Sequence, residues 1–450
     1  MKKRVVLVLL LVLIVLSGGL IYIGLLAPVI TGYAAKNLSS AIFVAGRTQE
    51  SMEREDLNFS FIKFNKNRVD LDKQEVISRF LFWKSKAQFN EGLGCTLVRD
   101  FPEEAVEALD YPEFDLPECN PDTIPWPAGD LLLDTIPGGI DLEKLEDALD
   151  QAFADTSGWK GTFGITVVYR DQIVAERFRS DFTPASRFLS WSMAKSFTNA
   201  IAGILVMDGK LDIHSPGLRP EWAGDTRNGI TVNHLLHMNS GLEWNEDYGN
   251  LSDVTVMLHK AGDMGDFAAA KKQVAPPDSI WLYSSGTTNI VCDYLRTLFA
   301  SDEEYLVFPR KALFSKTGMR SVIWEPDASG TLVGSSYLYA TQRDYARFGL
   351  LYLHHGKWLG KQILPEGWVE YTTTPAKGSG GQYGAFFWLN RSGEYPDVPE
   401  DMFSCNGHDG QYIFVIPSKE LVIVRTGYSP SGTFDIKTMV RLICETVEQS

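Results

Sequence analysis

Cysteine is scarce in this sequence and shows no metal-binding or redox spacing. The chain has five cysteines in 450 residues and no CxxC pair, so a zinc cluster or a thiol redox motif has no support. In an oxidising compartment Cys95 and Cys119 could close a short loop, and Cys405 could pair with Cys444, but isolated thiols fit an odd count equally well. The sequence therefore leaves disulfide pairing open and predicts no metal and no cofactor.

Positive charge is also in deficit. The 42 lysines and arginines are outnumbered by 57 aspartates and glutamates, which gives a formal net charge of -15. The acidic residues are spread along the chain rather than gathered in a tail, which argues against binding a polyanion by counterion release. We expect no nucleic-acid partner.

Several motifs of other protein classes are missing. The chain has no internal repeat, no low-complexity tract and no GxSxG nucleophile elbow, and the last absence counts against an α/β-hydrolase. Cys405 and His408 have the spacing of a metal-ligand pair, but no second Cys/His pair supports such a site. With 44% apolar residues, the chain is long enough for one large globular domain plus an extension, or for two ordinary domains.

The sequence does have a long apolar N-terminus. Basic residues at 2–4 precede a charge-free stretch over 5–30, which is longer than the ~20 residues that cross a bilayer as a helix. This length favours a retained signal-anchor, while small residues near 33–35 leave a cleaved signal peptide open. In both cases the positive-inside rule predicts that everything after about residue 35 lies outside the cytoplasm.

Composition divides the chain into three parts. Residues 1–35 are the signal-anchor or signal peptide. Residues 36–138 are expected to form an extension that begins with strands, up to about residue 97. From Arg99 to Gly139 the chain is acidic and proline-rich, which predicts a long loop with no element of its own, acting as a linker or a lid. Residues 139–450 are expected to form the functional domain.

Periodicity over 139–450 predicts an α+β fold. A helix with apolar residues at three- and four-residue steps follows Asp141, and β-hairpins are predicted at both ends of this part, over 164–178 and 411–426. A last helix is predicted over 434–447. Between the hairpins the signals are mostly helical, at 194–207, 232–238, 289–299 and 344–354. The predicted architecture is an antiparallel sheet from both chain ends, flanked by helices, with a mostly helical insert domain.

A candidate nucleophile and base lie one helical turn apart in Ser192-Met193-Ala194-Lys195. Because a helix begins next to Ser192, its hydroxyl lies near free backbone N–H groups and the positive end of the helix dipole. Lys195 follows on the same face, and a buried lysine readily becomes a neutral amine that can accept the hydroxyl proton. The alternative is that Ser192 only caps the helix and Lys195 is a solvated surface residue.

Two further segments follow in order, Tyr283-Ser284-Ser285-Gly286 and Gly407-His408-Asp409-Gly410-Gln411. With Trp191–Ser196 and His234–Leu242, they make the chain similar to the β-lactamase-related serine hydrolases. These include class C β-lactamases, family VIII carboxylesterases and 6-aminohexanoate-dimer hydrolases. The resemblance covers about residues 140–450 and implies the fold of β-lactamases and penicillin-binding proteins.

The resemblance also implies roles for individual residues. Ser192 would be the acyl-accepting nucleophile, Lys195 its proton acceptor and Tyr283 the residue that passes the proton to the leaving group. The Lys-Thr-Gly strand of the family would correspond to His408-Asp409-Gly410. The N–H that follows it, of Gln411, would then complete an oxyanion hole with that of Ser192.

A literal Lys316-Thr317-Gly318 also follows Tyr283. Its neighbours indicate the end of a helix and a turn rather than an edge strand. The segment at His408–Gly410 is followed instead by the last strand and the terminal helix, as the family requires. We therefore assign the third landmark to His408–Gly410.

The chain departs from the β-lactamase pattern at two substrate contacts. Ser285 stands where the family has an asparagine that holds the β-lactam amide, and His408 stands where it has a lysine that pairs with the carboxylate. Histidine is a poor permanent countercharge. We therefore predict hydrolysis of small esters or amides through a Ser192 acyl-enzyme. The protein is expected to be attached to the membrane and to lie outside the cytoplasm. The sequence does not determine its oligomeric state.

Other functions stay open on the sequence. Within the enzyme class, the same residues fit a D-amino-acid or peptidoglycan peptidase, or a weak β-lactamase. Outside it, they fit a non-catalytic sensor module that binds an acyl group covalently.

Overall fold

A six-stranded antiparallel sheet lies at the centre of the larger part of the protein. Its strand order is β12-β13-β14-β15-β5-β6, so strands from the two ends of the predicted domain pair directly through β15 and β5. The computed structural model describes residues 2–112, 120–154, 161–430 and 432–448. The strands are β5 (Gly161–Tyr169), β6 (Gln172–Phe178), β12 (Trp388–Leu389), β13 (Phe403–Gly407), β14 (Gln411–Ile416) and β15 (Leu421–Tyr428). The predicted antiparallel sheet from both chain ends is confirmed.

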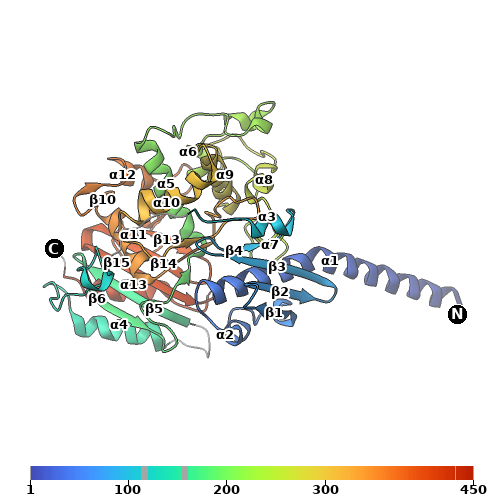
Figure 1. Cartoon of the computed structure of the whole chain (residues 1–450), viewed down its shortest axis with the longest axis horizontal. Helices are drawn as coiled ribbons and strands as arrows, with labels where there is room; N and C mark the ends of the chain where they lie inside the picture. The colour runs from blue at the N-terminus through green and yellow to red at the C-terminus, as the bar shows by residue number, and fades with distance from the viewer. Residues whose placement is uncertain (1, 113–119, 155–160, 431, 449–450) are drawn as a thin grey trace.

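Helices cover both faces of this sheet (Figure 1). On one face α4 (Leu142–Ala154) and α13 (Ile436–Glu445) lie against each other, and their apolar sides pack with Phe414 and Ile423. On the other face α11 (Gln342–Leu353) lies across β5, β14 and β15, within a larger core that includes α5 (Ala194–Met207). Helices on both faces of an antiparallel sheet confirm the α+β class.

The insert between the two sheet-forming ends is mostly helical, as predicted. It also carries a short three-stranded sheet in the order β7-β9-β8 and a small hairpin of β10 and β11. Its remaining elements are α6 (Val232–Leu236), α7 (Asp253–Lys260), α8 (Met264–Ala269), α9 (Ser285–Arg296), α10 (Asp302–Pro309), α12 (Trp368–Thr372), β7 (Phe188–Leu189), β8 (Ile323–Trp324), β9 (Leu338–Ala340), β10 (Lys357–Trp358) and β11 (Lys361–Gln362).

The N-terminal part consists of one long helix and a small sheet. The helix α1 (Lys2–Phe43) leads through α2 (Gln49–Arg54) into the antiparallel sheet of β1 (Lys66–Asp70), β2 (Glu75–Phe80), β3 (Trp83–Asn90) and β4 (Gly94–Leu97). The second half of α1 packs against β2, β3 and β4 on one side and against α7 of the insert on another. The extension therefore shares a packed surface with the hydrolase-like part.

A buried ion pair joins the two parts. Lys36 on α1 contacts the carboxylate of Glu325, and both side chains are almost fully buried. The same carboxylate accepts hydrogen bonds from Ser40 Oγ and from the backbone N–H of Cys95, each at 2.7 Å. Breaking a buried, hydrogen-bonded pair of this kind is strongly destabilising. The pair therefore holds the second half of α1 in the body of the protein.

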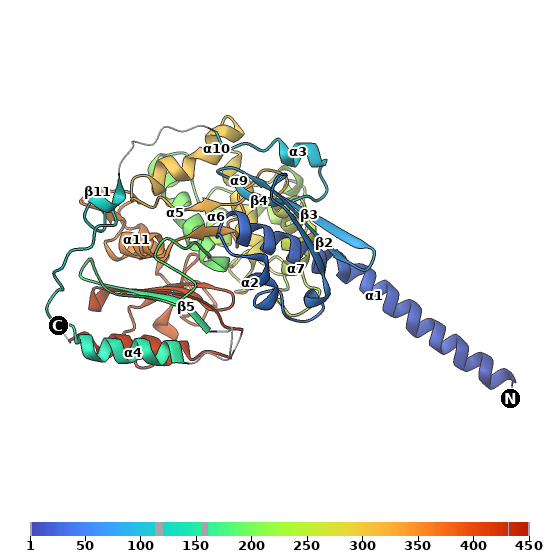
Figure 2. The ribbon, with the colours of Figure 1, turned by 60° about the horizontal axis from the view of Figure 1, so that its bottom comes forward.

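The first half of α1 extends away from that body (Figures 1 and 2). The large apolar side chains from Val6 to Ile14, and those of Leu20 and Ile21, are 48% to 67% exposed, whereas most side chains from Ala27 onward are buried. By length and composition, the helix is able to cross a membrane.

The proline-rich segment from Arg99 to Gly139 differs from its prediction. Instead of lacking structure it contains the helix α3 (Glu103–Glu107) and a 3-10 turn at Pro121–Thr123. Pro102 and Pro121 stand at the start of these turns, where the fixed φ of proline favours a helix and its missing N–H costs nothing. The prediction treated proline only as a breaker and missed this role.

The cysteines make no disulfide among the described residues. Cys95, Cys292, Cys405 and Cys444 are free and buried, so the suggested Cys405–Cys444 pair does not form. Cys119, the suggested partner of Cys95, lies outside the described residues.

Candidate active site

Ser192 lies in a tight turn that leads directly into α5. Residues Trp191–Met193 form a 3-10 turn, η3, and α5 begins at Ala194. Trp191 has a left-handed backbone with φ of 46°, a strained conformation for a bulky residue that costs about 1–3 kcal/mol. The N-cap of α5 is Met193 and makes no side-chain capping bond. Ser192 is therefore not a helix cap, which removes the purely structural explanation of this serine.

Lys195 is buried and points its amine at Ser192. The Lys195 Nζ donates to Ser192 Oγ at 2.9 Å, to Ser285 Oγ at 3.0 Å and to the backbone oxygen of Ser335 at 3.1 Å. Burial lowers the pKa of Lys195 from 10.5 to about 8, while the charge of Glu246 opposes this shift. A useful fraction of the amine is therefore neutral near physiological pH and can accept a proton.

Tyr283 completes the group around the serine hydroxyl. Its side chain lies near that of Ser192, and the Lys195 Nζ lies 5.0 Å from the centre of its ring. Burial raises the pKa of Tyr283, the carboxylate of Glu246 raises it further, and the polar Ser192 side chain beside it partly offsets both. The structure thus brings together Ser192, Lys195 and Tyr283, which the sequence had singled out from three separate segments.

Glu246 is a member of the site that the sequence did not reveal. Its carboxylate accepts the Ser285 hydroxyl at 2.5 Å, the Ser285 backbone N–H at 2.9 Å and the Trp244 Nε1 at 2.5 Å. It lies in the loop after Ser240-Gly241-Leu242, where glutamate and aspartate are frequent and no motif marks it. Because Ser285 donates to Glu246, its oxygen is free to accept from Lys195.

Ser285 therefore has a different place from the one predicted. The sequence interpretation put it on the substrate side, as the counterpart of an amide-binding asparagine. In the structure its side chain is fully buried and links Lys195 to Glu246. It supports the base rather than facing a substrate.

His408 lies beside the nucleophile turn, as predicted. Its ring is 5.4 Å from that of Trp191 in an edge-on arrangement and stacks on Tyr248 at 4.3 Å. A hydrophobic and aromatic surface of this kind suits an apolar or amphipathic acyl group. Tyr248 is a further lining residue that the sequence did not single out.

Gly410 and Gln411 make hydrogen bonds to β15. The strand that packs on η3 most closely is β13, and a Cβ on Gly407 would lie 2.2 Å from the backbone oxygen of Ser190. Gly410 instead faces Arg425, whose Nη1 donates to the Gly410 oxygen at 2.6 Å. The Gln411 side chain is occupied with the backbone of Gly427.

The glycine that packs closely lies three residues before the one expected from the sequence. Gly407, not Gly410, makes the close approach that the glycine of Lys-Thr-Gly makes possible, and Gln411 belongs to β14, which is paired with β13 and β15. The backbone N–H that follows the closely packed glycine is then that of His408.

The literal Lys-Thr-Gly triplet does not form a strand. Lys316-Thr317-Gly318 follows the π-helical turn at Arg310–Phe314, and the Thr317 hydroxyl donates to the Leu313 oxygen at 2.8 Å. Gly318 has a left-handed φ of 74°, as expected just after a helix. The prediction that this triplet ends a helix is confirmed.

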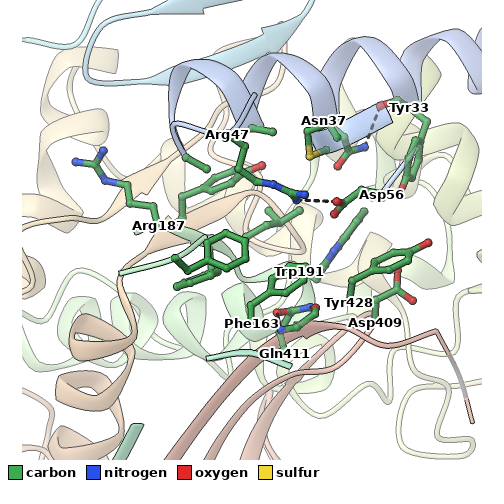
Figure 3. Close-up of a pocket in the computed structure, with 18 residues that line it drawn as sticks. Tyr33, Asn37, Arg47, Asp56, Phe163, Arg187, Trp191, Asp409, Gln411 and Tyr428 are labelled. Carbon is green, nitrogen blue, oxygen red and sulfur yellow. Dashed lines mark hydrogen bonds and ion pairs between the residues drawn. The ribbon is translucent and has the colours of Figure 1, made fainter. Parts of the chain in front are cut away.

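A small cavity of about 60 Å³ lies beside η3. Figure 3 shows Trp191, Asp409 and Gln411 on one side of it and Tyr33 and Asn37 of α1 on the other. The helix α1 therefore forms one wall of a cavity next to η3. Among the described residues, no group of three or more His, Cys, Asp or Glu side chains could hold a metal ion.

Comparison with known proteins gives consistent results. A model of the beta-lactamase family matches residues 146–436, about two thirds of the chain. A 6-aminohexanoate-dimer hydrolase from Paenarthrobacter ureafaciens is 24% identical over 317 residues, covering 64% of this chain and 76% of that protein. Residues 1–145 lie outside the family match.

Two solved structures share the fold. A family VIII carboxylesterase superposes with a TM-score of 0.54 at 16% identity, over 68% of this chain and 96% of its own. A penicillin-binding protein homologue from Caulobacter crescentus gives a TM-score of 0.54 at 15% identity, over 69% and 97%. At these identities the likeness concerns the fold alone.

Proposed function

Because the chain belongs to the beta-lactamase family and is a serine hydrolase, we propose that it cleaves small esters or amides through an acyl-enzyme on Ser192. The observation that carries this proposal is the buried Lys195 amine, 2.9 Å from Ser192 Oγ, with the Tyr283 ring 5.0 Å from that amine. A nucleophile, a base of lowered pKa and a second proton carrier within hydrogen-bond reach are what acyl transfer needs.

The reaction divides into two steps. The Ser192 oxygen attacks the carbonyl carbon, its proton moves to the neutral Lys195 amine, and the carbonyl oxygen takes the negative charge. Tyr283 then relays a proton from Lys195 to the leaving alcohol or amine, whose bond to carbon breaks. In the second step water attacks the acyl-serine by the same route and releases the acid.

The developing negative charge needs two backbone donors. The N–H of Ser192, at the start of α5, is one. We place the second at His408, because Gly407 rather than Gly410 packs against the nucleophile turn. The structure of a covalent phosphonate adduct would test this assignment, which is wrong if the phosphonyl oxygen faces Gln411 instead.

The walls of the site favour an apolar or amphipathic acyl group. Trp191, Tyr248 and His408 form one aromatic group, and Tyr283 packs against Trp388 at 5.3 Å. Neither the asparagine nor the lysine that binds a β-lactam in class C enzymes is present. We therefore place esters and linear amides ahead of β-lactams and D-alanyl peptides as substrates.

We also propose that α1 anchors the enzyme outside the cytoplasm. Three basic residues precede its apolar half, which orients such a helix with its N-terminus inside. The hydrolase part then faces the far side of the membrane.

Both proposals can be tested with one class of probe. A fluorophosphonate should label the full-length protein on the peptide that contains Ser192, identified by mass spectrometry, and not on the one that contains Ser285. A charged, membrane-impermeant fluorophosphonate should label it equally well in right-side-out membrane vesicles. Absence of any label would contradict the hydrolase mechanism, and label only after vesicle lysis would contradict the orientation.

A substrate screen separates the alternatives. We expect turnover of p-nitrophenyl esters and linear amides, with little hydrolysis of a cephalosporin and little release of D-alanine from muropeptides. Dominant D-alanine release would identify a peptidase. A stable acyl adduct without turnover would identify a sensor module.

The pH dependence of ester hydrolysis reports on Lys195. Because the neutral amine is the base and its pKa is about 8, kcat/KM should rise with pH through about 8 and then level off. Glu246 raises the pKa of Lys195, so Glu246→Gln should move this rise to lower pH. A pH profile that is identical in the two proteins would show that Glu246 does not act on the base.

A further inference from the structure

The length of the exposed half of α1 matches the thickness of a bilayer. From Val5 to Gly24 the helix has about 20 residues, which rise about 30 Å, the thickness of the hydrocarbon core. The basic residues at 2–4 lie just before this stretch. After Gly24 the helix enters the protein, and Ala27 is already fully buried. The outer membrane boundary therefore falls close to Gly24.

The turn between β2 and β3 lies beside Gly24, at the level of the outer membrane boundary. A Cβ on Gly24 would be 3.6 Å from the Trp83 ring, and Figure 2 shows this end of the sheet beside α1 where the helix leaves the body. The two turn residues are strongly exposed, Leu81 at 57% and Phe82 at 85%. Large apolar side chains at a turn are costly in water, so this turn is adapted to another environment.

More aromatic side chains continue the same surface. The Phe82 ring lies 5.5 Å from Trp83, and the Phe61 ring lies 6.3 Å from Phe80, the strand partner of Trp83. Phe61 is 48% exposed and Phe64 is 59% exposed. We call Phe61, Phe64, Leu81, Phe82 and Trp83 the interfacial patch. Aromatic side chains of this kind are enriched where proteins meet the membrane–water boundary.

Basic side chains lie one position further along the strands, on the face of the sheet opposite Trp83. Lys66 pairs with Arg79 across β1 and β2, and Arg79 pairs with Lys84 across β2 and β3. Directly opposite residues share one face of a sheet, so the three exposed cations form a row. Among the described residues none of them lies within salt-bridge distance of a carboxylate, and the nearest acidic influence is that of Glu103 on Lys84. Like charges in this arrangement repel each other unless an anion lies against them.

We propose that the interfacial patch inserts into the headgroup region of the membrane, with the row Lys66, Arg79 and Lys84 on the phosphates of anionic lipids. This inference rests on the proposed anchoring by α1 and adds a second attachment beside it. A helix alone leaves a protein free to tilt, whereas a helix and an adjacent patch fix its orientation. The cavity wall formed by Tyr33 and Asn37 then lies a fixed nine and thirteen residues along α1 from Gly24, about 14 and 20 Å.

Photo-crosslinking of the full-length protein tests the proposal. p-Benzoylphenylalanine replaces Phe82, Leu20 or Leu359 in turn, and the proteins are reconstituted into vesicles of phosphatidylcholine and phosphatidylglycerol. Leu20 lies in the exposed half of α1 at 62% exposure, and Leu359, at 63%, lies in the β10–β11 turn of the insert. We expect phospholipid adducts at positions 20 and 82, and at least about fivefold fewer at 359.

Lipid identity provides a second readout. The adducts at position 82 should contain a larger share of phosphatidylglycerol than the vesicles do. The variant Lys66→Glu/Arg79→Glu/Lys84→Glu should remove this enrichment while leaving the adducts at position 20 unchanged. Equal enrichment in both proteins would overturn the role of the basic row.

The other outcomes are equally decisive. Lipid at position 20 but none at position 82 would show that the patch faces water and that α1 is the sole attachment. Crosslinks from position 82 to a second copy of the chain would make it a dimer surface. No lipid at position 20 would refute the anchor itself, and fluorophosphonate labelling would still report separately on the hydrolase site.

Discussion

Replacing Ser192 with alanine is expected to abolish fluorophosphonate labelling and to lower kcat/KM for p-nitrophenyl esters by about 10⁴- to 10⁶-fold. No acyl-enzyme can form without the Ser192 oxygen, and only transition-state stabilisation by backbone donors would remain. The fold should survive, because the change removes one hydroxyl and one hydrogen bond, worth about 1 kcal/mol. Thermal unfolding followed by circular dichroism checks this.

The matched control is Ser285→Ala. Both serines touch the same amine, Ser192 at 2.9 Å and Ser285 at 3.0 Å. Ser192 lies in the turn before α5 and is 9% exposed, whereas Ser285 is fully buried. Ser285→Ala should therefore keep its label on Ser192, with slower turnover because Lys195 loses its link to Glu246. Labelling that survives in Ser192→Ala and disappears in Ser285→Ala would reverse the assignment.

Much of the fold could be predicted because its signals are local. The helix at α5 has a continuous apolar pattern, and the hairpins at both ends of the sheet show alternating apolar residues around short turns. The long proline-rich segment was less predictable, because proline both ends helices and begins them. Whether a proline ends or begins a helix depends on the residues around it. At α3 the side chain of Val106 is buried, so tertiary packing stabilises this short helix.

The site was predictable where spacing carries the chemistry. Ser192 and Lys195 are three residues apart where a 3-10 turn continues into α5. A helical backbone brings residues at this spacing together, so the sequence alone predicts their contact. Glu246 was not predictable, because its role depends on a loop folding back onto the start of α9, and a glutamate in an acidic loop has no distinctive signal. The close contact of Gly407 with the Ser190 oxygen was not predictable either, since a glycine has no side chain to indicate what packs against it.

Removing the amine of Lys195 is the second change with a large expected effect. Lys195→Met keeps the length of the side chain and its apolar contacts but cannot accept a proton. We expect kcat/KM to fall by about 10²- to 10⁴-fold, with the rate of fluorophosphonate labelling falling in parallel. The rise of activity through pH 8 should disappear, because the group whose pKa is about 8 is absent.

The Lys195→Met variant should be less active but more stable than the unchanged protein. The folded-state pKa of Lys195 is about 8 against 10.5 when unfolded, so the charged amine is disfavoured in the folded protein, by an amount of order 3 kcal/mol. This penalty is fully present below pH 8 and vanishes as pH rises toward 10.5. Lys195→Met removes it and should raise the thermal unfolding temperature at pH 7, with a smaller gain at pH 10.

Lys195→Arg distinguishes a base from a mere positive charge. Arginine keeps the cation and several hydrogen-bond donors but does not lose its proton in proteins. If Lys195 is the proton acceptor, Lys195→Arg should be as inactive as Lys195→Met at every pH. Substantial activity in Lys195→Arg, without a rise through pH 8, would mean that the positive charge alone supports catalysis and that Tyr283 takes the proton from Ser192.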